Sequence, residues 1–171
     1  TEDSQFFVTS KPTPSSLQKS DICAISSNSA GLTVGTLCTG IKFGSTVHPI
    51  ILPSIEVYGT KNYTYSIVAT DDKTVIAGFR MIYEIPVKII GLSMVNGVEK
   101  VRTSRIFFHR SGAAAEPIEL KWGILVAHDT SPGRPILVGM NATTIRKTSF
   151  EHIEEHTLIE PFSQWIGRAL T

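Results

Sequence analysis

The sequence predicts a mainly β protein, either an antiparallel β-sandwich or a jelly-roll-like barrel, with a short C-terminal helical segment. Short apolar runs rich in β-branched and aromatic residues recur between Leu32 and Ile145, as expected for strands. Polar turns separate these runs at close intervals, and no helical periodicity interrupts them. The 171 residues are enough for one domain with a full hydrophobic core.

The dipeptide Asn96-Gly97 is the strongest local signal for a hairpin. It separates the apolar runs 84–95 and 98–108. Both residues accept the positive φ that a type I′ turn requires. The same reasoning places two further turns at residues 71–73 and 131–135, which gives seven or eight short strands in total.

Composition divides the chain into three segments. Residues 9–20 are rich in Pro, Ser and Thr and contain one large apolar side chain, Leu17. Such a stretch cannot build a core, so we expect residues 1–21 to form a flexible N-terminal arm. The antiparallel β domain then spans 22–147, and a helical segment spans 148–171, packing on the β domain or on a partner.

The helical prediction for the C-terminal segment rests on two patterns. Thr148 and Glu151 fit a capping box, which would begin a short helix that continues through His156. Pro161 suits the first turn of a second helix. The apolar residues of that second helix recur at the spacing of one amphipathic face: Phe162, Trp165, Ile166, Ala169 and Leu170.

The two cysteines, Cys23 and Cys38, lie in a polar stretch rich in Ser and Gly. A disulfide between them is sterically allowed, but two cysteines do not make a disulfide framework, so free thiols in a reducing compartment are favoured. The first ten residues also lack the basic-then-apolar pattern of a signal peptide. We therefore expect a cytoplasmic protein, in the host cytoplasm or the virion if it is viral.

The motifs argue against an enzyme. His152-Ile-Glu-Glu-His156 fits the H-x-x-E-H pattern of zinc proteases, but those enzymes need a further acidic ligand well downstream and only 15 residues follow. We therefore expect two histidines on a helix surface, with no metal and no cofactor. His128 and Asp129 are neighbours on a strand and point to opposite faces, so they cannot form a catalytic dyad. No nucleophile elbow or phosphate-binding loop occurs.

Basic residues are concentrated in one part of the chain. Residues 99–147 carry eight basic and four acidic groups, whereas residues 148–171 carry one basic and four acidic groups. Cations alternate with aromatic residues near Phe107 and Phe108, a composition suited to nucleic acid or an anionic membrane surface. The alternative is a solvated strand face. The candidate anion-contacting residues are Lys100, Arg102, Arg105, Arg110, Arg146 and Lys147.

These features favour a non-enzymatic assembly protein that associates with copies of itself and contacts nucleic acid, nucleoprotein or an anionic membrane. No run of 18 apolar residues occurs, so no transmembrane segment is expected. A monomeric β-sandwich binding module is the alternative, and a hydrolase or metal enzyme comes third. The residues predicted to mediate self-association are Phe6, Phe7, Val8, Phe162, Trp165, Ile166 and Leu170.

The layout resembles that of small viral structural proteins. In β-rich matrix, coat and movement proteins, as in this sequence, a compact β domain is flanked by an arm and a terminal helix that mediate assembly. The resemblance covers the order of segments and no diagnostic motif, so no site residue is carried over. It implies a matrix or capsid protein of a virion, with RNA as a partner.

Overall fold

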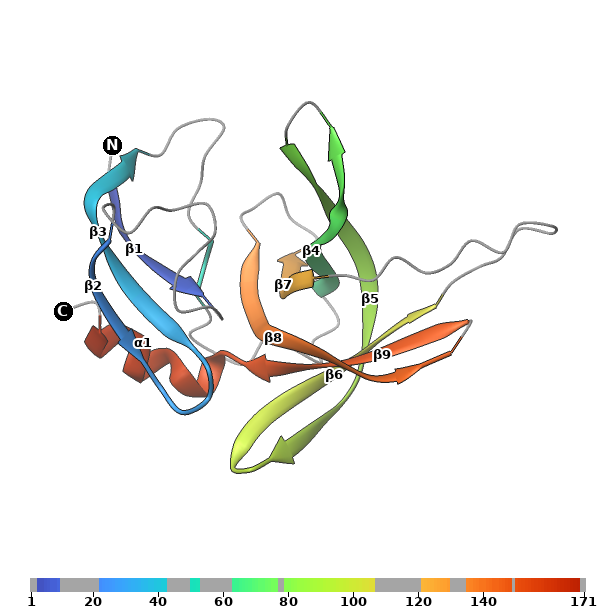
Figure 1. Ribbon diagram of the computed structural model, residues 1–171. Coiled ribbons are helices and arrows are strands. Elements are labelled where there is room, and N and C mark those ends of the chain that lie inside the picture. Colours follow the sequence, from blue (N-terminus) through green and yellow to red (C-terminus); the bar gives the residue numbers. More distant parts are fainter. Residues whose placement is uncertain are drawn as a thin grey trace.

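The computed structural model describes residues 3–9, 22–42, 50–52, 63–76, 79–106, 121–129, 135–148 and 150–169. Within these ranges the chain is mainly β, with one short C-terminal α-helix, which confirms the predicted fold class. Figure 1 shows a small three-stranded sheet beside a six-stranded barrel, with the helix against the small sheet. No described helix has the length and apolar character needed to cross a membrane.

The barrel is closed, and its hydrogen-bonded strands are all antiparallel, in the order β4-β5-β6-β9-β8-β7. Closure removes the free edges that an open sheet would present. The strands are β4 (Tyr63–Ile76), β5 (Phe79–Val95), β6 (Val98–Ile106), β7 (Lys121–Asp129), β8 (Ile136–Lys147) and β9 (Glu151–Leu158).

The predicted Asn96-Gly97 hairpin is confirmed and joins β5 to β6. Asn96 has φ 50° and Gly97 has φ 77°, while Val95 pairs with Val98 across the turn. The turn predicted at residues 71–73 is wrong, because β4 continues to Ile76 and its ladder with β5 only shifts register there. A short polar run is thus accommodated as an irregularity inside one strand.

The small sheet contains β1 (Asp3–Thr9), β2 (Ile22–Ser27) and β3 (Thr33–Lys42), in the order β1-β3-β2. Residues 3–9 are therefore a strand and not part of a flexible arm, with Phe7 paired to Gly35. The composition argument considered only the Pro/Ser-rich stretch and missed that Phe6-Phe7-Val8 favours a β-strand. Most of that stretch lies outside the described residues.

The two cysteines form a disulfide, contrary to the expectation of free thiols. Cys23 on β2 and Cys38 on β3 have their Cα atoms 5.1 Å apart, a normal separation for a disulfide. Ile22 pairs with Leu37, and a register shift follows at Cys23. The bond therefore crosses between neighbouring strands of one hairpin, a register that the sequence does not reveal.

The first helix predicted in the C-terminal segment is wrong, because Glu151–Leu158 is strand β9. The predicted cap contact does form: the Glu151 amide donates to Thr148 Oγ1 at 3.0 Å. Thr148 Oγ1 also donates to the Glu151 carbonyl oxygen, so the same residues close the turn between β8 and β9. After β9 come the 3-10 turn Glu160–Phe162 and helix α1 (Ser163–Ala169).

Among the described residues, two apolar clusters form the core. One fills the barrel, and the other joins the small sheet, strand β8 and the C-terminal segment, so the apolar face of α1 packs on its own chain. Ile166 is fully buried there, and Phe162 and Trp165 pack against the same cluster. The barrel cluster consists of Tyr65, Ile67, Ala69, Val101, Leu125, Ala127, Val138 and Leu158.

Candidate functional site

The H-x-x-E-H motif lies on β9, where alternate residues face the barrel interior. His152, Glu154 and His156 are buried, whereas Glu155 lies on the other face and bonds to Arg102. Two histidines four residues apart on a strand are separated by about 13 Å, too far to share one metal ion. The motif is thus neither a zinc site nor a helix-surface pair, and the described residues contain no group of three potential metal ligands.

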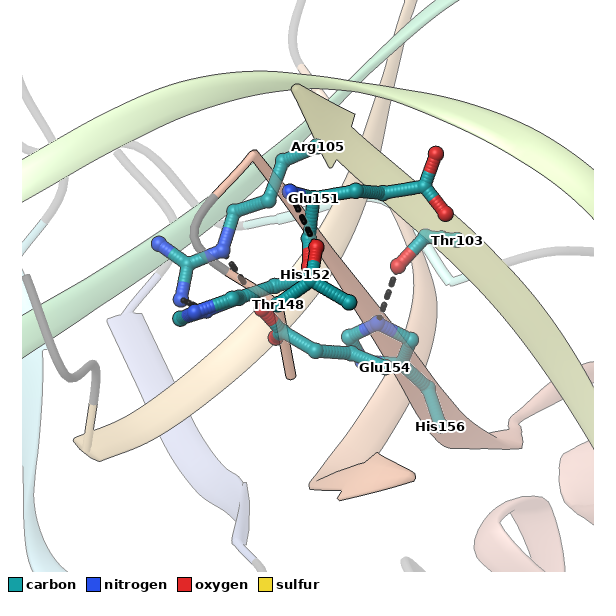
Figure 2. Close-up of polar contacts among 7 residues, drawn as sticks. All are labelled: Thr103, Arg105, Thr148, Glu151, His152, Glu154 and His156. Atoms are coloured by element: carbon teal, nitrogen blue, oxygen red, sulfur yellow. Dashed lines mark hydrogen bonds and ion pairs between the residues drawn. The ribbon is translucent and has the colours of Figure 1, made fainter. Parts of the chain in front are cut away.

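Strand β6 places a buried arginine against this face of β9. Arg105 pairs with His152 in the ladder, its Nε lies 2.7 Å from Glu154 Oε1, and its Nη2 donates to His152 Nδ1 at 2.9 Å (Figure 2). Because arginine only donates, His152 accepts at Nδ1 and is neutral. Burial raises the pKa of Glu154, and Arg105 opposes this rise through its charge and a hydrogen bond.

His156 completes the polar cluster deeper in the barrel. Its Nε2 lies 3.0 Å from Thr103 Oγ1 (Figure 2), and its side chain is inaccessible to solvent. Burial lowers the pKa of His156 to about 4, with Glu155 raising it and Lys100 lowering it further. The imidazole is therefore neutral at physiological pH.

We call Thr103, Arg105, His152, Glu154 and His156 the barrel polar cluster. All five side chains are buried, so none can contact a substrate that stays outside the barrel. The ion pair and the two hydrogen bonds described above all join β6 to β9. The arrangement can fix the pairing of these two strands, and it offers no accessible acid, base or nucleophile.

The six basic candidates do not form one surface. Arg105 is inside the barrel, which removes it from any anion-binding face. Arg102 is ion-paired to Glu155 at 2.9 Å, and Lys100 donates to Thr157 Oγ1 at 2.8 Å. Arg146 and Lys147 are exposed on β8, while Arg110 lies outside the described residues.

One exposed histidine–carboxylate pair lies on the outside of the barrel. His128 Nε2 is 2.7 Å from Glu84 Oε1, which joins β7 to β5. A hydrolytic site would need a hydroxyl or thiol on the other ring nitrogen of His128. Among the described residues, no such group is hydrogen-bonded to His128.

The sequence did not reveal an exposed apolar stretch on β5. Ile90, Leu92 and Met94 on β5 are 49%, 54% and 62% exposed. They lie near the Asn96-Gly97 turn, in the hairpin that projects beyond the barrel in Figure 1. The run 85–95 reads as a core strand in sequence. The length of this run was the sequence feature that could have indicated the projection, because a strand longer than its neighbours extends past them.

The residues predicted to mediate self-association lie elsewhere. Phe6, Phe7 and Val8 are in β1, whose backbone pairs with β3. The helix residues Phe162, Trp165 and Ile166 contact their own chain, and Leu170 lies outside the described residues. None of these predicted residues belongs to the β5–β6 hairpin, where Ile90, Leu92 and Met94 are exposed.

No family model and no curated protein matches the sequence. Among solved structures, the chain is similar to neuropsin, a serine protease expressed in the limbic system of mouse brain. The TM-score is 0.48 and the sequence identity 16%, with 96% of this chain and 70% of the neuropsin chain covered. At this level the likeness assigns no activity to the chain.

Proposed function

We propose that this chain is a non-enzymatic assembly protein that associates with copies of itself through the projecting β5–β6 hairpin. The observation that carries the proposal is the exposure of Ile90, Leu92 and Met94 on one short stretch of strand. Exposed apolar residues that lie together mark sites of protein contact, whereas single ones do not. The described acid–base groups do not favour a competing reaction, because the barrel polar cluster is buried and His128 is hydrogen-bonded to Glu84 and, within the described part of the chain, to no nucleophile.

Approximate free energies of apolar burial and of association indicate how strongly two copies would bind. Complete burial of one Leu, Ile or Met side chain contributes about 1.5–3 kcal/mol. A symmetric contact that covers the exposed halves of six such side chains therefore contributes on the order of 5 kcal/mol. The lost translational and rotational freedom of two molecules costs about 4–15 kcal/mol. Apolar burial alone thus supports weak association, and a stable complex needs a further contribution.

The alternative proposal is a binding module that uses the same hairpin for a different protein. It shares the supporting observation and differs in oligomeric state. A hydrolase is less well supported, because His128 and Glu84 provide a base and its orienting acid without a hydrogen-bonded nucleophile.

The remaining expectations stay predictions. For contact with nucleic acid or a membrane, Arg146 and Lys147 remain candidates because they are exposed, whereas Arg105 is no longer a candidate because it is buried. A viral structural role rests only on the layout of the chain. For the compartment, the Cys23–Cys38 disulfide favours an oxidising environment over the cytoplasm.

The test is light scattering after size-exclusion chromatography across protein concentration. We expect the mass to rise with concentration for the wild type and to stay at the monomer for the double variant Leu92→Ser, Met94→Ser. The matched control is Ile145→Ser, Phe150→Ser, which removes two exposed apolar side chains on or beside β8 and should associate normally. Equal association of the three proteins would overturn the role of the hairpin.

A further inference from the structure

We infer that the Cys23–Cys38 disulfide is a redox-sensitive switch: its reduction releases β2 from β3, beginning at Cys23, while the barrel stays folded. The inference does not depend on the proposed self-association, because β2 and the β5–β6 hairpin belong to different sheets. In the reaction, a dithiol reductant supplies two electrons and two protons to the S–S bond. The bond becomes two thiols, and the reductant is oxidised to its own disulfide.

Both cysteines are accessible in the folded protein. Cys23 on β2 and Cys38 on β3 are exposed residues. A thiolate in solution can therefore attack the S–S bond directly, and exposed disulfides of this kind are the labile ones. The chain contains no further cysteine, so a reductant has no other target. Reduction can thus precede the unfolding of the rest of the chain.

Side-chain packing contributes little to the attachment of β2. Every residue of β2 after Ile22 is exposed, and no residue of β2 belongs to either apolar cluster. Ile25, for example, is 49% exposed. Among the described elements, β3 is the only one that β2 contacts extensively. A pair of strands without such packing is marginally stable in water, so the covalent bond is an important part of what holds β2 in place.

Strand β3 is held by the core and should stay in place when β2 leaves. Val34 and Leu37 are buried, and Val34 packs in the apolar cluster with Met140 of β8 and Ile166 of α1. Strand β1 also pairs with β3, on the edge opposite β2. Release of β2 therefore leaves β3 folded and removes the partner strand from the edge between Thr33 and Leu37.

The two ends of β2 are attached in different ways. At the turn between β2 and β3, Ser27 Oγ and Thr33 Oγ1 share a 2.8 Å hydrogen bond, and Asn141 Nδ2 of β8 donates to the Ala30 carbonyl oxygen. At the other end, a register shift at Cys23 interrupts the ladder with β3, and the disulfide joins the strands there. Reduction removes the attachment at this end alone, so β2 should separate from Cys23 toward the turn.

Amide hydrogen exchange of the full chain, with and without dithiothreitol, tests the release of β2. After reduction, exchange in residues 22–26 should become about tenfold or more faster, because the cross-link no longer restricts the open segment. It should also be much faster than exchange in β9, which opens only with the barrel. Unchanged exchange in residues 22–26 of the reduced protein would overturn the inference. Equal rates in residues 22–26 and β9 would show that the whole fold opens together, which would overturn it as well.

Thiol alkylation and a double variant complete the test. Iodoacetamide should label both cysteines after treatment with dithiothreitol in the absence of denaturant, and labelling that requires denaturant would overturn the accessibility of the bond. Cys23→Ser, Cys38→Ser is the matched control for the reductant itself. Its exchange in residues 22–26 should equal that of the reduced wild type and should not respond to dithiothreitol. Reoxidation of the wild type should restore slow exchange.

Discussion

Arg105 Nη2 donates a 2.9 Å hydrogen bond to His152 Nδ1 inside the barrel. The same guanidinium forms an ion pair with Glu154. One cation therefore fixes both the charge state of a histidine and the position of a carboxylate, and all three groups are withdrawn from solvent. This explains why the most suggestive motif in the sequence provides strand pairing and no chemistry.

Removing Arg105 should destabilise the fold strongly. In Arg105→Met, Glu154 stays buried without its countercharge, and we expect a loss of about 3–5 kcal/mol in the free energy of unfolding. The double variant Arg105→Met, Glu154→Met should recover much of this loss, because an apolar pair replaces the ionic one. Urea unfolding measures both. The control Arg102→Met removes a partly exposed arginine and should cost less than about 1 kcal/mol; equal losses for the two arginines would contradict the assignment.

The stability of the fold should fall as the pH drops from about 6.5 toward 4. The unfolded chain binds a proton at His156 near pH 6.5, whereas in the folded chain burial lowers the pKa of His156 to about 4. The unfolded state therefore holds more protons in this window, which lowers the free energy of unfolding by about 3 kcal/mol at its acidic end.

The raised pKa of Glu154 acts in the opposite direction, because the folded state then binds a proton more readily than the unfolded state. The wild type must therefore be compared with His156→Gln, in which only the histidine contribution is absent. We expect a flatter pH dependence for the variant in urea titrations between pH 7 and 4. Parallel curves would show that His156 does not contribute.

Reduction of the disulfide should destabilise the protein. Cys23 and Cys38 are 15 residues apart. A cross-link that closes a loop of that length lowers the entropy of the unfolded chain and thereby raises the free energy of unfolding by about 3 kcal/mol. Cys23→Ser, Cys38→Ser should lower the midpoint of thermal unfolding, and a reductant should lower it for the wild type alone. A reductant without effect on the wild type would contradict the bond.

Gly139 should not tolerate a larger side chain. A Cβ added there would lie 2.8 Å from the Cβ of His156, closer than such atoms approach, so Gly139→Ala must displace β8 from β9. We expect a loss of about 1–3 kcal/mol in urea unfolding, as for other overpacked cores. The control Gly167→Ala meets no atom within 4 Å and should be neutral or stabilising, since alanine favours a helix. Equal effects would contradict the close approach of the two strands.

The sequence predicted local structure where the local chemistry is sufficient. Asn96 and Gly97 form their turn because both accept positive φ. Strand β9 could not be predicted in this way, because its inward residues His152, Glu154 and His156 are polar. The alternation of apolar and polar residues that identifies a strand is therefore absent from this part of β9. The Thr148–Glu151 contact then favoured a helix, since the same hydrogen bond occurs at helix caps and in this hairpin turn.

The sequence did not predict the candidate site, because its features depend on which strands are neighbours. Arg105 belongs to a basic run and became a surface candidate, yet its partners come from β9, 47 and 49 positions further along the chain. Likewise, the exposed residues Leu92 and Met94 lie in the part of β5 that pairs with β6 and not with β4. Neither the composition nor the periodicity of residues 85–95 indicates where the pairing of β5 with β4 ends.

Sedimentation equilibrium of the wild type and of Met94→Lys, across protein concentration, tests the central claim most directly. A lysine at this position places a charge among the exposed apolar side chains of the β5–β6 hairpin and should prevent association. The account predicts a reversible monomer–dimer equilibrium for the wild type and a monomer for Met94→Lys at the same concentrations. A wild type that remains monomeric throughout, or a variant that dimerises equally well, would contradict it.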